Sequence, residues 1–266
     1  MAKLVFNIPH LLLFSVESGQ LEVIVELLEF AVVSFLLSFL FALGGLGSAV
    51  ALIPVLVFLG VPFSVARSAG LFTNFVTTLS ASIHNLKEGL IDFRLAIPVL
   101  ISAFVSAPAG AYASTVIPER VVGLAFTIFL FFAGFMVYTP KKELFRVRSS
   151  LYPFFVGLIS GFLSGLLGVG GGGIISPLLI IAGYNPKRVV PVTAFVVVFS
   201  SLSAFLAYLK LGKVDWGLTL AVALPSAFSG YLGALVTHRY LSSSQVKKLL
   251  GLVFIILGVK FLTKFL

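Results

Sequence analysis

The two halves of this chain carry the same sequence pattern, displaced by 123 residues. Segment 87–93 reads Lys-Glu-Gly-Leu-Ile-Asp-Phe, and segment 210–216 reads Lys-Leu-Gly-Lys-Val-Asp-Trp. With the same displacement and no gap, five further residues meet an identical residue in the second half: Gly45 meets Gly168, Gly47 meets Gly170, Pro54 meets Pro177, Gly60 meets Gly183 and Gly110 meets Gly233. A duplicated hydrophobic chain with glycine-interrupted segments at equivalent places is typical of transporters whose site lies between the repeats.

Charge is scarce in this chain and unevenly distributed along it. Apolar residues make up 59% of the sequence and charged residues 10%, whereas about one quarter of an average globular domain is charged. The charges occur in short clusters between long uncharged runs, and about 20 apolar residues suffice for a helix to cross the hydrocarbon of a bilayer. The sequence therefore predicts an all-α, polytopic protein of the cell membrane, surrounded by the lipid bilayer.

The uncharged runs indicate how the chain is organised. Residues 30–66 and 151–186 carry no charge, and each run is long enough for two short helices with a break between them. Each run is followed by three candidate single spans, at 68–86, 95–117 and 121–138 in the first half and at 189–209, 216–237 and 244–264 in the second. We therefore expect four parts: an N-terminal interfacial segment (1–29), a first membrane repeat (30–138), a basic connector (139–150) and a second membrane repeat (151–266).

The relative orientation of the repeats depends on whether each broken pair of helices crosses the membrane once or turns back. Cytoplasmic loops carry an excess of Lys and Arg, but both topologies place eleven of these residues on one side and seven on the other. We favour the hairpin, because an unbroken helix over the 36 residues of the second run would extend about 54 Å. Hairpins give each half an odd number of crossings, so we expect the second half to be inverted relative to the first.

Four glutamates precede the first repeat, and three of them have a helical spacing. Glu22, Glu26 and Glu29 are spaced so that they share one face of a helix. This pattern indicates the solvated face of an amphipathic helix at the membrane interface; the alternative is a role for Glu29 in proton coupling.

Glycine clusters interrupt both uncharged runs at equivalent places. One cluster is Gly168-Val169-Gly170-Gly171-Gly172-Gly173, and its counterpart is Gly44-Gly45-Leu46-Gly47-Ser48. Irregular backbone inside a membrane is tolerated only where protein or a water-filled cavity satisfies its polar groups, and converging N–H groups at helix N-termini favour an anion. The alternative is close helix packing, which we expect for Gly161 and Gly165. The candidate binding residues in the clusters are Gly45, Gly47, Ser48, Gly168, Gly170, Gly171, Gly172 and Gly173.

Polar side chains within the spans supply further candidates, because each costs free energy unless it faces a partner or a cavity. Thr73, Asn74 and Thr77 lie in the span 68–86, while Thr193 and Ser200 lie in the span 189–209. Asn74 is the strongest candidate to line a site. Hydroxyl groups in membrane helices commonly bond to their own backbone or to a neighbouring helix, and this is the alternative for the others.

Several charged residues lie at the ends of the spans. Arg67 and Arg188 begin two spans and would attract an anion at a vestibule; ordinary flanking charge is the alternative. Asp92 and Asp215 precede an aromatic residue that opens a span, which is the position of an N-cap carboxylate. His84 is expected at a span end.

With no cysteine and three scattered histidines, we predict neither a metal site nor a cofactor.

Taken together, these motifs resemble the sulfite exporter TauE/SafE family. The shared pattern is a glycine-rich break, an apolar run to Pro, a Leu-Gly or similar pair, a Pro or Asn-Pro turn, a small and hydroxyl-rich segment, and a Lys-x-Gly-x-[Ile/Val]-Asp-aromatic loop. It occurs in both halves. The resemblance implies a membrane transporter of small sulfur-containing anions such as sulfite, sulfoacetate or other organosulfonates. In the first half Ser48-Ala49-Val50 replaces the additional glycines, so that loop is expected to bind less or only to pack.

The resemblance and the glycine clusters together favour an exporter that works by alternating access around a central anion site. An inside-negative membrane favours export of an anion by about 2.3 kcal/mol per charge at 100 mV. The alternatives are an anion channel and a sodium-coupled carrier of another small organic anion.

An enzyme is not expected, because the spans show no acid–base or nucleophile–base pair. The net charge of +9 is divided among loops on both sides, which indicates lipid headgroups rather than nucleic acid as a partner. Pairing of two copies is left open.

Overall fold

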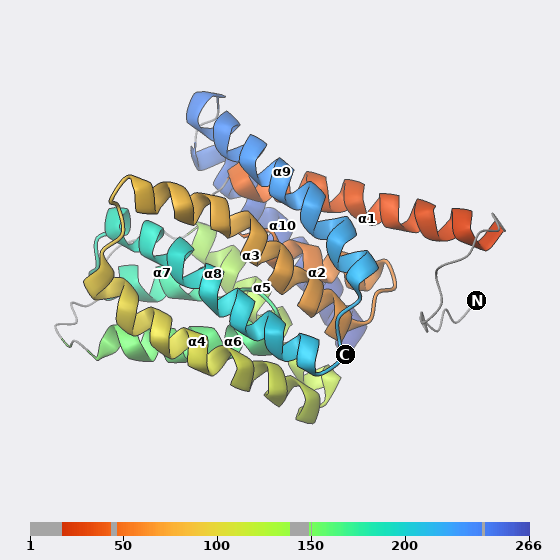
Figure 1. The fold of residues 1–266 in the computed structure, drawn as a ribbon, viewed down its shortest axis with the longest axis horizontal. Coiled ribbons are helices and arrows are strands. Elements are labelled where there is room, and N and C mark those ends of the chain that lie inside the picture. Colours follow the sequence, from red (N-terminus) through yellow and green to blue (C-terminus); the bar gives the residue numbers. More distant parts are fainter. Residues whose placement is uncertain (1–17, 44–46, 139–148, 150, 241–242) are drawn as a thin grey trace.

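The computed structural model describes residues 18–43, 47–138, 149, 151–240 and 243–266. Within these ranges the chain is helical and forms ten helices (Figure 1). The helices are α1 (Ser18–Leu43), α2 (Ala49–Phe58), α3 (Phe63–Lys87), α4 (Phe93–Val116), α5 (Glu119–Tyr138), α6 (Tyr152–Leu167), α7 (Gly172–Ile181), α8 (Pro186–Lys210), α9 (Trp216–Tyr240) and α10 (Ser243–Phe265). The prediction of an all-α fold is confirmed.

The predicted membrane character is confirmed as well. Among the described residues, four helices are long and apolar enough to cross a bilayer: Val23–Phe41, Phe93–Val116, Glu119–Met136 and Pro186–Lys210. The six predicted single spans correspond within a few residues to α3, α4, α5, α8, α9 and α10. Helix α3 is not one of the four, because its hydroxyl and amide side chains lower its hydropathy.

Both uncharged runs contain a break that is followed by a short helix. The breaks precede α2 and α7, which have ten residues each and are therefore about 15 Å long, roughly half the hydrocarbon thickness. In the first half, α1 begins at Ser18 and continues past residue 29 without interruption. The predicted basic connector lies almost entirely outside the described residues.

Helices α6 and α7 form a hairpin. The hydroxyl of Tyr152, at the start of α6, donates a hydrogen bond of 2.9 Å to the carbonyl oxygen of Leu178, near the end of α7. The start of α6 and the end of α7 therefore lie side by side, and the glycine-rich break connects the end of α6 to the start of α7. The chain thus turns back within this run, as the hairpin topology requires.

Helices α3 and α8 lie side by side and run in opposite directions. Ser68, in the second turn of α3, donates a hydrogen bond of 2.8 Å to the carbonyl oxygen of Lys213, just beyond the end of α8. These helices occupy equivalent places in the two halves, and an inverted arrangement requires them to be antiparallel. The inversion of the complete halves stays a prediction.

Small residues bring α4 and α6 into close contact. A Cβ atom placed on Gly161 would lie 2.5 Å from Ala103 Cα, and one on Gly165 would lie 2.8 Å from the nitrogen of Ala111. Such short distances mean that the two backbones approach more closely than any larger side chain permits. The packing role expected for both glycines is confirmed.

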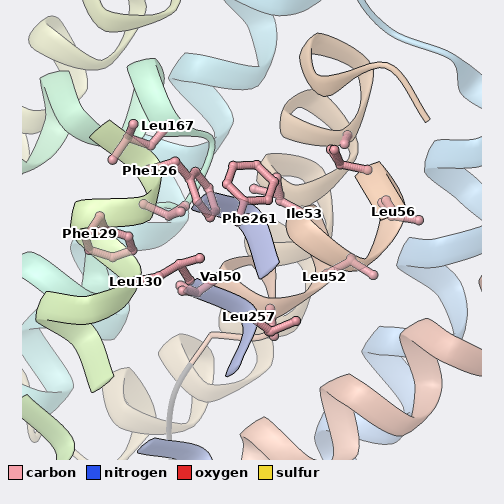
Figure 2. Packing of buried hydrophobic residues seen from close by; sticks show 14 of the residues in the cluster. Val50, Leu52, Ile53, Leu56, Phe126, Phe129, Leu130, Leu167, Leu257 and Phe261 are labelled. Atoms are coloured by element: carbon pink, nitrogen blue, oxygen red, sulfur yellow. The ribbon is translucent and has the colours of Figure 1, made fainter. Parts of the chain in front are cut away.

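Apolar side chains enclose α2 (Figure 2). Val50, Leu52, Ile53 and Leu56 are buried and belong to one cluster with residues of α5, α6 and α10, namely Phe126, Phe129, Leu130, Leu167, Leu257 and Phe261. The short helix is therefore surrounded by protein rather than by lipid. This position allows irregular backbone at its N-terminus to be satisfied inside the protein.

Both predicted helix caps are present. The carboxylate of Asp92 accepts hydrogen bonds of 3.2 Å and 3.4 Å from the backbone nitrogens of Arg94 and Leu95. Asp215 accepts one of 2.9 Å from the nitrogen of Leu218. Both carboxylates satisfy first-turn N–H groups, so the prediction is confirmed. His84 lies in the last turn of α3 and is exposed, as expected.

Candidate functional site

Three glycines make the break between α6 and α7 possible. Gly168, Gly170 and Gly171 have positive φ angles of 82°, 74° and 75°. Residues with a Cβ atom rarely adopt this left-handed conformation. These left-handed residues separate α6, which ends at Leu167, from α7, which begins at Gly172.

Backbone N–H groups in this break lack acceptors. The N–H of Gly168 donates to the carbonyl of Ser164 at 2.8 Å, and the next backbone donors with an acceptor are Ile174 and Ile175, which bond to the carbonyl of Gly171. Among the described residues, the N–H groups of positions 169–173 have no hydrogen-bond partner. The N-terminus of α7 therefore presents several free donors together with the positive end of its helix dipole.

Helix α2 begins in the same manner. The carbonyl of Ser48 accepts hydrogen bonds from the nitrogens of Ala51 and Leu52, at 3.1 Å and 2.9 Å. The Ser48 side chain does not cap the helix. Within the described part of the chain, the first-turn N–H groups of Ala49 and Val50 have no acceptor. Gly47 and Ser48 are thus at a second free helix N-terminus, while Gly45 lies outside the described residues.

Asn74 of α3 lies between the two breaks. A Cβ atom on Gly47 would collide with Asn74 Oδ1, and one on Gly170 would collide with Asn74 Nδ2 and lie 2.7 Å from Ser201 Oγ. The amide therefore touches a glycine from each half. Asn74 is 1% exposed, and its Nδ2 donates a hydrogen bond of 3.3 Å to Ser201 Oγ on α8.

Several buried polar side chains of α3, α6 and the α2 N-terminus contain an atom without a partner in the described part of the chain. Asn74 Oδ1 and the hydroxyl groups of Ser48, Thr73 and Ser164 have no hydrogen-bond partner among the described residues. Leaving such a group buried and unpaired costs about 1–3 kcal/mol. Ser164 is close to the break, because a Cβ atom on Gly171 would lie 3.5 Å from Ser164 Cβ. The arrangement is suited to a small polar ligand that would satisfy these groups.

The remaining polar candidates have protein partners. Ser200 Oγ donates a hydrogen bond of 3.4 Å to the carbonyl of Gly170, so it touches the break. Thr77 Oγ1 donates to the carbonyl of Thr73 at 2.9 Å, which is the backbone bonding given as its alternative. Thr193 Oγ1 accepts a bond of 2.9 Å from Ser176 on α7 and so holds α7 against α8.

Gly172 and Gly173 open α7, and their surroundings are apolar. A Cβ atom on Gly172 would lie 3.3 Å from Val197 Cγ2, and one on Gly173 would lie 3.2 Å from the Phe129 ring. What these two residues offer to a ligand is therefore their free N–H groups.

Ser201 and Ser164 are not among the residues that the sequence predicts for the site. Ser201 is the only side chain that bonds to the Asn74 amide in the described residues, and it is fully buried. The sequence does contain a signal for Ser201, because the displacement of 123 residues pairs it with Thr78, another hydroxyl residue. Ser164 stands between Gly161 and Gly165, and no feature of the sequence separates it from that packing motif.

The two arginines named from the sequence lie in different environments. Arg188 has a side chain that is 70% exposed and forms an ion pair of 3.6 Å with Asp92. The pair lines an open pocket of about 440 Å³ together with Arg94, Tyr184 and Asn185. Arg67 is instead 3% exposed, so it does not stand at an open vestibule.

Proteins with similar sequences carry the names of membrane transporters. A "probable membrane transporter protein" of Methanocaldococcus jannaschii is 27% identical over 248 residues, which are 86% of this chain and 92% of that protein. The probable membrane transporter protein YunE of Bacillus subtilis is 23% identical, over 80% of this chain and 89% of its own length. Sulfite exporter TauE/SafE family protein 1 of Arabidopsis thaliana is 34% identical over 33% of this chain and 19% of that protein. No solved structure matches the chain.

The family comparison covers most of the chain. The model of the family described as "Sulfite exporter TauE/SafE" matches residues 30–261. This range contains both glycine breaks, α3 and α8, and it agrees with the multi-pass membrane character of the helices. The chain is therefore an integral membrane transporter that belongs to the sulfite exporter TauE/SafE family.

Proposed function

We propose that this protein exports a small sulfur-containing oxyanion, such as sulfite or an organosulfonate, through a site centred on Asn74. The observation that carries the proposal is the contact of the Asn74 amide with Gly47 and with Gly170. This contact brings the free N-termini of α2 and α7 to one buried place. Two helix N-termini directed at one point attract negative charge more strongly than one.

The donors around Asn74 match the chemistry of an oxyanion. Each oxygen of a sulfite or sulfonate group accepts hydrogen bonds from more than one direction, and backbone N–H groups, hydroxyls and an amide supply donors around it. No carboxylate contacts the described part of this site. Because all these donors are uncharged, binding is expected to be modest, as transport requires.

The proposed transport mechanism is alternating access. The two short helices belong to different halves, and α3 and α8 lie side by side at the site through the bond between Asn74 and Ser201. If the halves are inverted repeats, rocking one against the other opens the site first to one side and then to the other. Export follows from the potential of an inside-negative membrane, which drives an anion outwards.

One observation also supports a sodium-coupled carrier. Asn74 Oδ1 is an acceptor that receives no hydrogen bond from the described residues. Amide and backbone carbonyl oxygens beside an unwound helix coordinate Na⁺ in several transporters. Under this second candidate, Na⁺ binds next to the anion and the two move together.

Counterflow in proteoliposomes tests the proposal. Vesicles loaded with sulfite should accumulate labelled sulfite with saturable kinetics, and sulfoacetate should compete whereas a carboxylate of similar size should not. A sodium gradient that stimulates flux would favour the second candidate, and single-channel currents in a planar bilayer would identify a channel instead.

A matched pair of variants tests the site. Asn74→Leu should abolish counterflow, because the apolar side chain removes the amide between the two breaks. Asn85→Leu, on the same helix but near its outer end, should transport normally. Equal transport by both variants at equal abundance would refute a site at Asn74.

A further inference from the structure

Arg67 is a buried cation beside the glycine break. Its side chain is 3% exposed. A Cβ atom placed on Gly168 would lie 2.7 Å from Arg67 Cβ and 2.8 Å from Arg67 Cα. The break is therefore pressed directly onto α3 at this arginine.

The partners of the guanidinium carry no negative charge. Arg67 donates hydrogen bonds of 2.8 Å to the carbonyl of Leu166 and of 3.4 Å to the carbonyl of Phe63. The guanidinium carbon lies 4.5 Å from the centre of the Phe63 ring and 5.6 Å from that of Tyr208. In the described part of the chain no carboxylate lies within ion-pair distance of it, and the exposed Glu119 acts on it only through space.

A structural role explains part of this arrangement. Leu166 is in the last turn of α6, and a cation at a helix C-terminus is stabilised by the negative end of the dipole. That dipole is equivalent to about half a negative charge, which leaves Arg67 with net positive charge in a buried place. A buried charge without full compensation is costly and is usually retained for a function.

The break connects this charge to the proposed site along one face of α3. Positions 67, 70 and 74 share that face by their i, i+3, i+7 spacing. A Cβ atom on Gly70 would lie 3.5 Å from the carbonyl oxygen of Gly168, and Asn74 touches Gly170. The Arg67 and Asn74 backbones are therefore about 10 Å apart along the helix axis, and the guanidinium is directed away from Asn74, because it donates to the carbonyl of Phe63 one turn earlier.

We propose that Arg67 is the fixed counter-charge of the anion site: it sets the preference of the site for anions, and for dianions over monoanions, without contacting the substrate. This inference rests on the proposed function. At such a separation in protein surroundings, a unit charge alters the affinity for a monoanion on the order of tenfold and for a dianion on the order of a hundredfold. The dependence on ligand charge distinguishes this role from a merely structural one.

Two probes of the proposed substrate class measure that dependence. Sulfite at alkaline pH is a dianion, and methanesulfonate is a monoanion. Half-saturation concentrations for both are measured in proteoliposomes with wild-type protein, Arg67→Gln and Arg67→Lys. Arg67→Gln should raise the value about tenfold for methanesulfonate and about a hundredfold for sulfite, while Arg67→Lys should return the ratio of the two values towards that of the wild type.

Arg120→Gln is the matched control. Arg120 also donates to backbone carbonyls at a helix C-terminus, those of Phe265 and Leu266, but it is exposed and its loss changes the net charge equally. In Arg120→Gln the ratio of the half-saturation concentrations for sulfite and methanesulfonate should equal that of the wild type. If wild-type protein transports neither probe, the proposed function is wrong; if it transports both and Arg67→Gln changes both by the same factor, only the role of Arg67 is wrong.

Discussion

Asn74 Nδ2 donates a hydrogen bond of 3.3 Å to Ser201 Oγ and so joins α3 of the first half to α8 of the second. Both side chains are buried, and both lie against Gly170. The bond fixes the orientation of the amide, because the other amide atom, Oδ1, has no partner in the described residues. The geometry of the proposed site therefore depends on Ser201, which lies in α8 and not in either break.

Replacing Ser201 by Ala should weaken transport more than it weakens the fold. Loss of one hydrogen bond costs about 1 kcal/mol of stability, but the freed Asn74 amide can rotate, and we expect the half-saturation concentration for sulfite to rise about tenfold. Counterflow and thermal unfolding of purified protein measure the two effects. Ser203→Ala is the control, because Ser203 is on the same helix and bonds instead to the carbonyl of Phe104. Similar kinetics in both variants would contradict an orienting role for Ser201.

A methyl group on Gly170 should stop transport. Gly170→Ala would bring a Cβ atom into collision with Asn74 Nδ2, and the φ angle of +74° adds strain of about 1–2 kcal/mol. Gly212→Ala carries similar strain, since the φ angle of Gly212 is +64°, but no atom lies within 4 Å of its Cβ position. Counterflow is measured for both variants at equal abundance. If only Gly170→Ala loses transport, the collision with Asn74 is the cause and not the backbone strain. Normal flux through Gly170→Ala would remove this break from the site.

The architecture was predictable because it follows from charge distribution and repetition. Uncharged runs locate the helices, and the displacement of 123 residues identifies the two breaks. The sequence predicts Asp92 and Asp215 as caps because an N-cap needs only local sequence, and both caps are present. The spans and caps follow from residues that are neighbours in the chain, and the breaks follow from comparing two such stretches.

The asymmetry of the site was harder to predict. The displacement pairs Asn74 with Val197, so only one half supplies an amide, and Val197 instead faces Gly172. The sequence predicts that Arg67 begins a span at an open vestibule, yet the residue is buried against Gly168. Both facts depend on how the break packs across α3, a contact between residues about 100 positions apart that no local pattern encodes.

The close contact of α4 and α6 should tolerate no bulk. Gly161→Leu would push a side chain into Ser106 and Ala103, and overpacking typically costs 1–3 kcal/mol or more. We expect a lower unfolding temperature and a smaller yield of purified protein. Ile159→Leu changes a residue of the same helix that is 50% exposed and should leave the unfolding temperature unchanged. Equal stability of both variants would show that α4 and α6 have room between them.

Arg188→Ala should leave transport nearly unchanged. The Arg188 side chain is 70% exposed, and its nitrogen lies 3.6 Å from the Asp92 carboxylate, so the ion pair is worth about 0–1 kcal/mol. Asp92 retains its capping bonds to the nitrogens of Arg94 and Leu95 without the arginine. The half-saturation concentration for sulfite should therefore change less than about twofold, and a moderate increase in salt should have little further effect because an exposed pair is already screened. A loss of affinity that grows as salt is lowered would instead identify Arg188 as part of the route by which the anion enters.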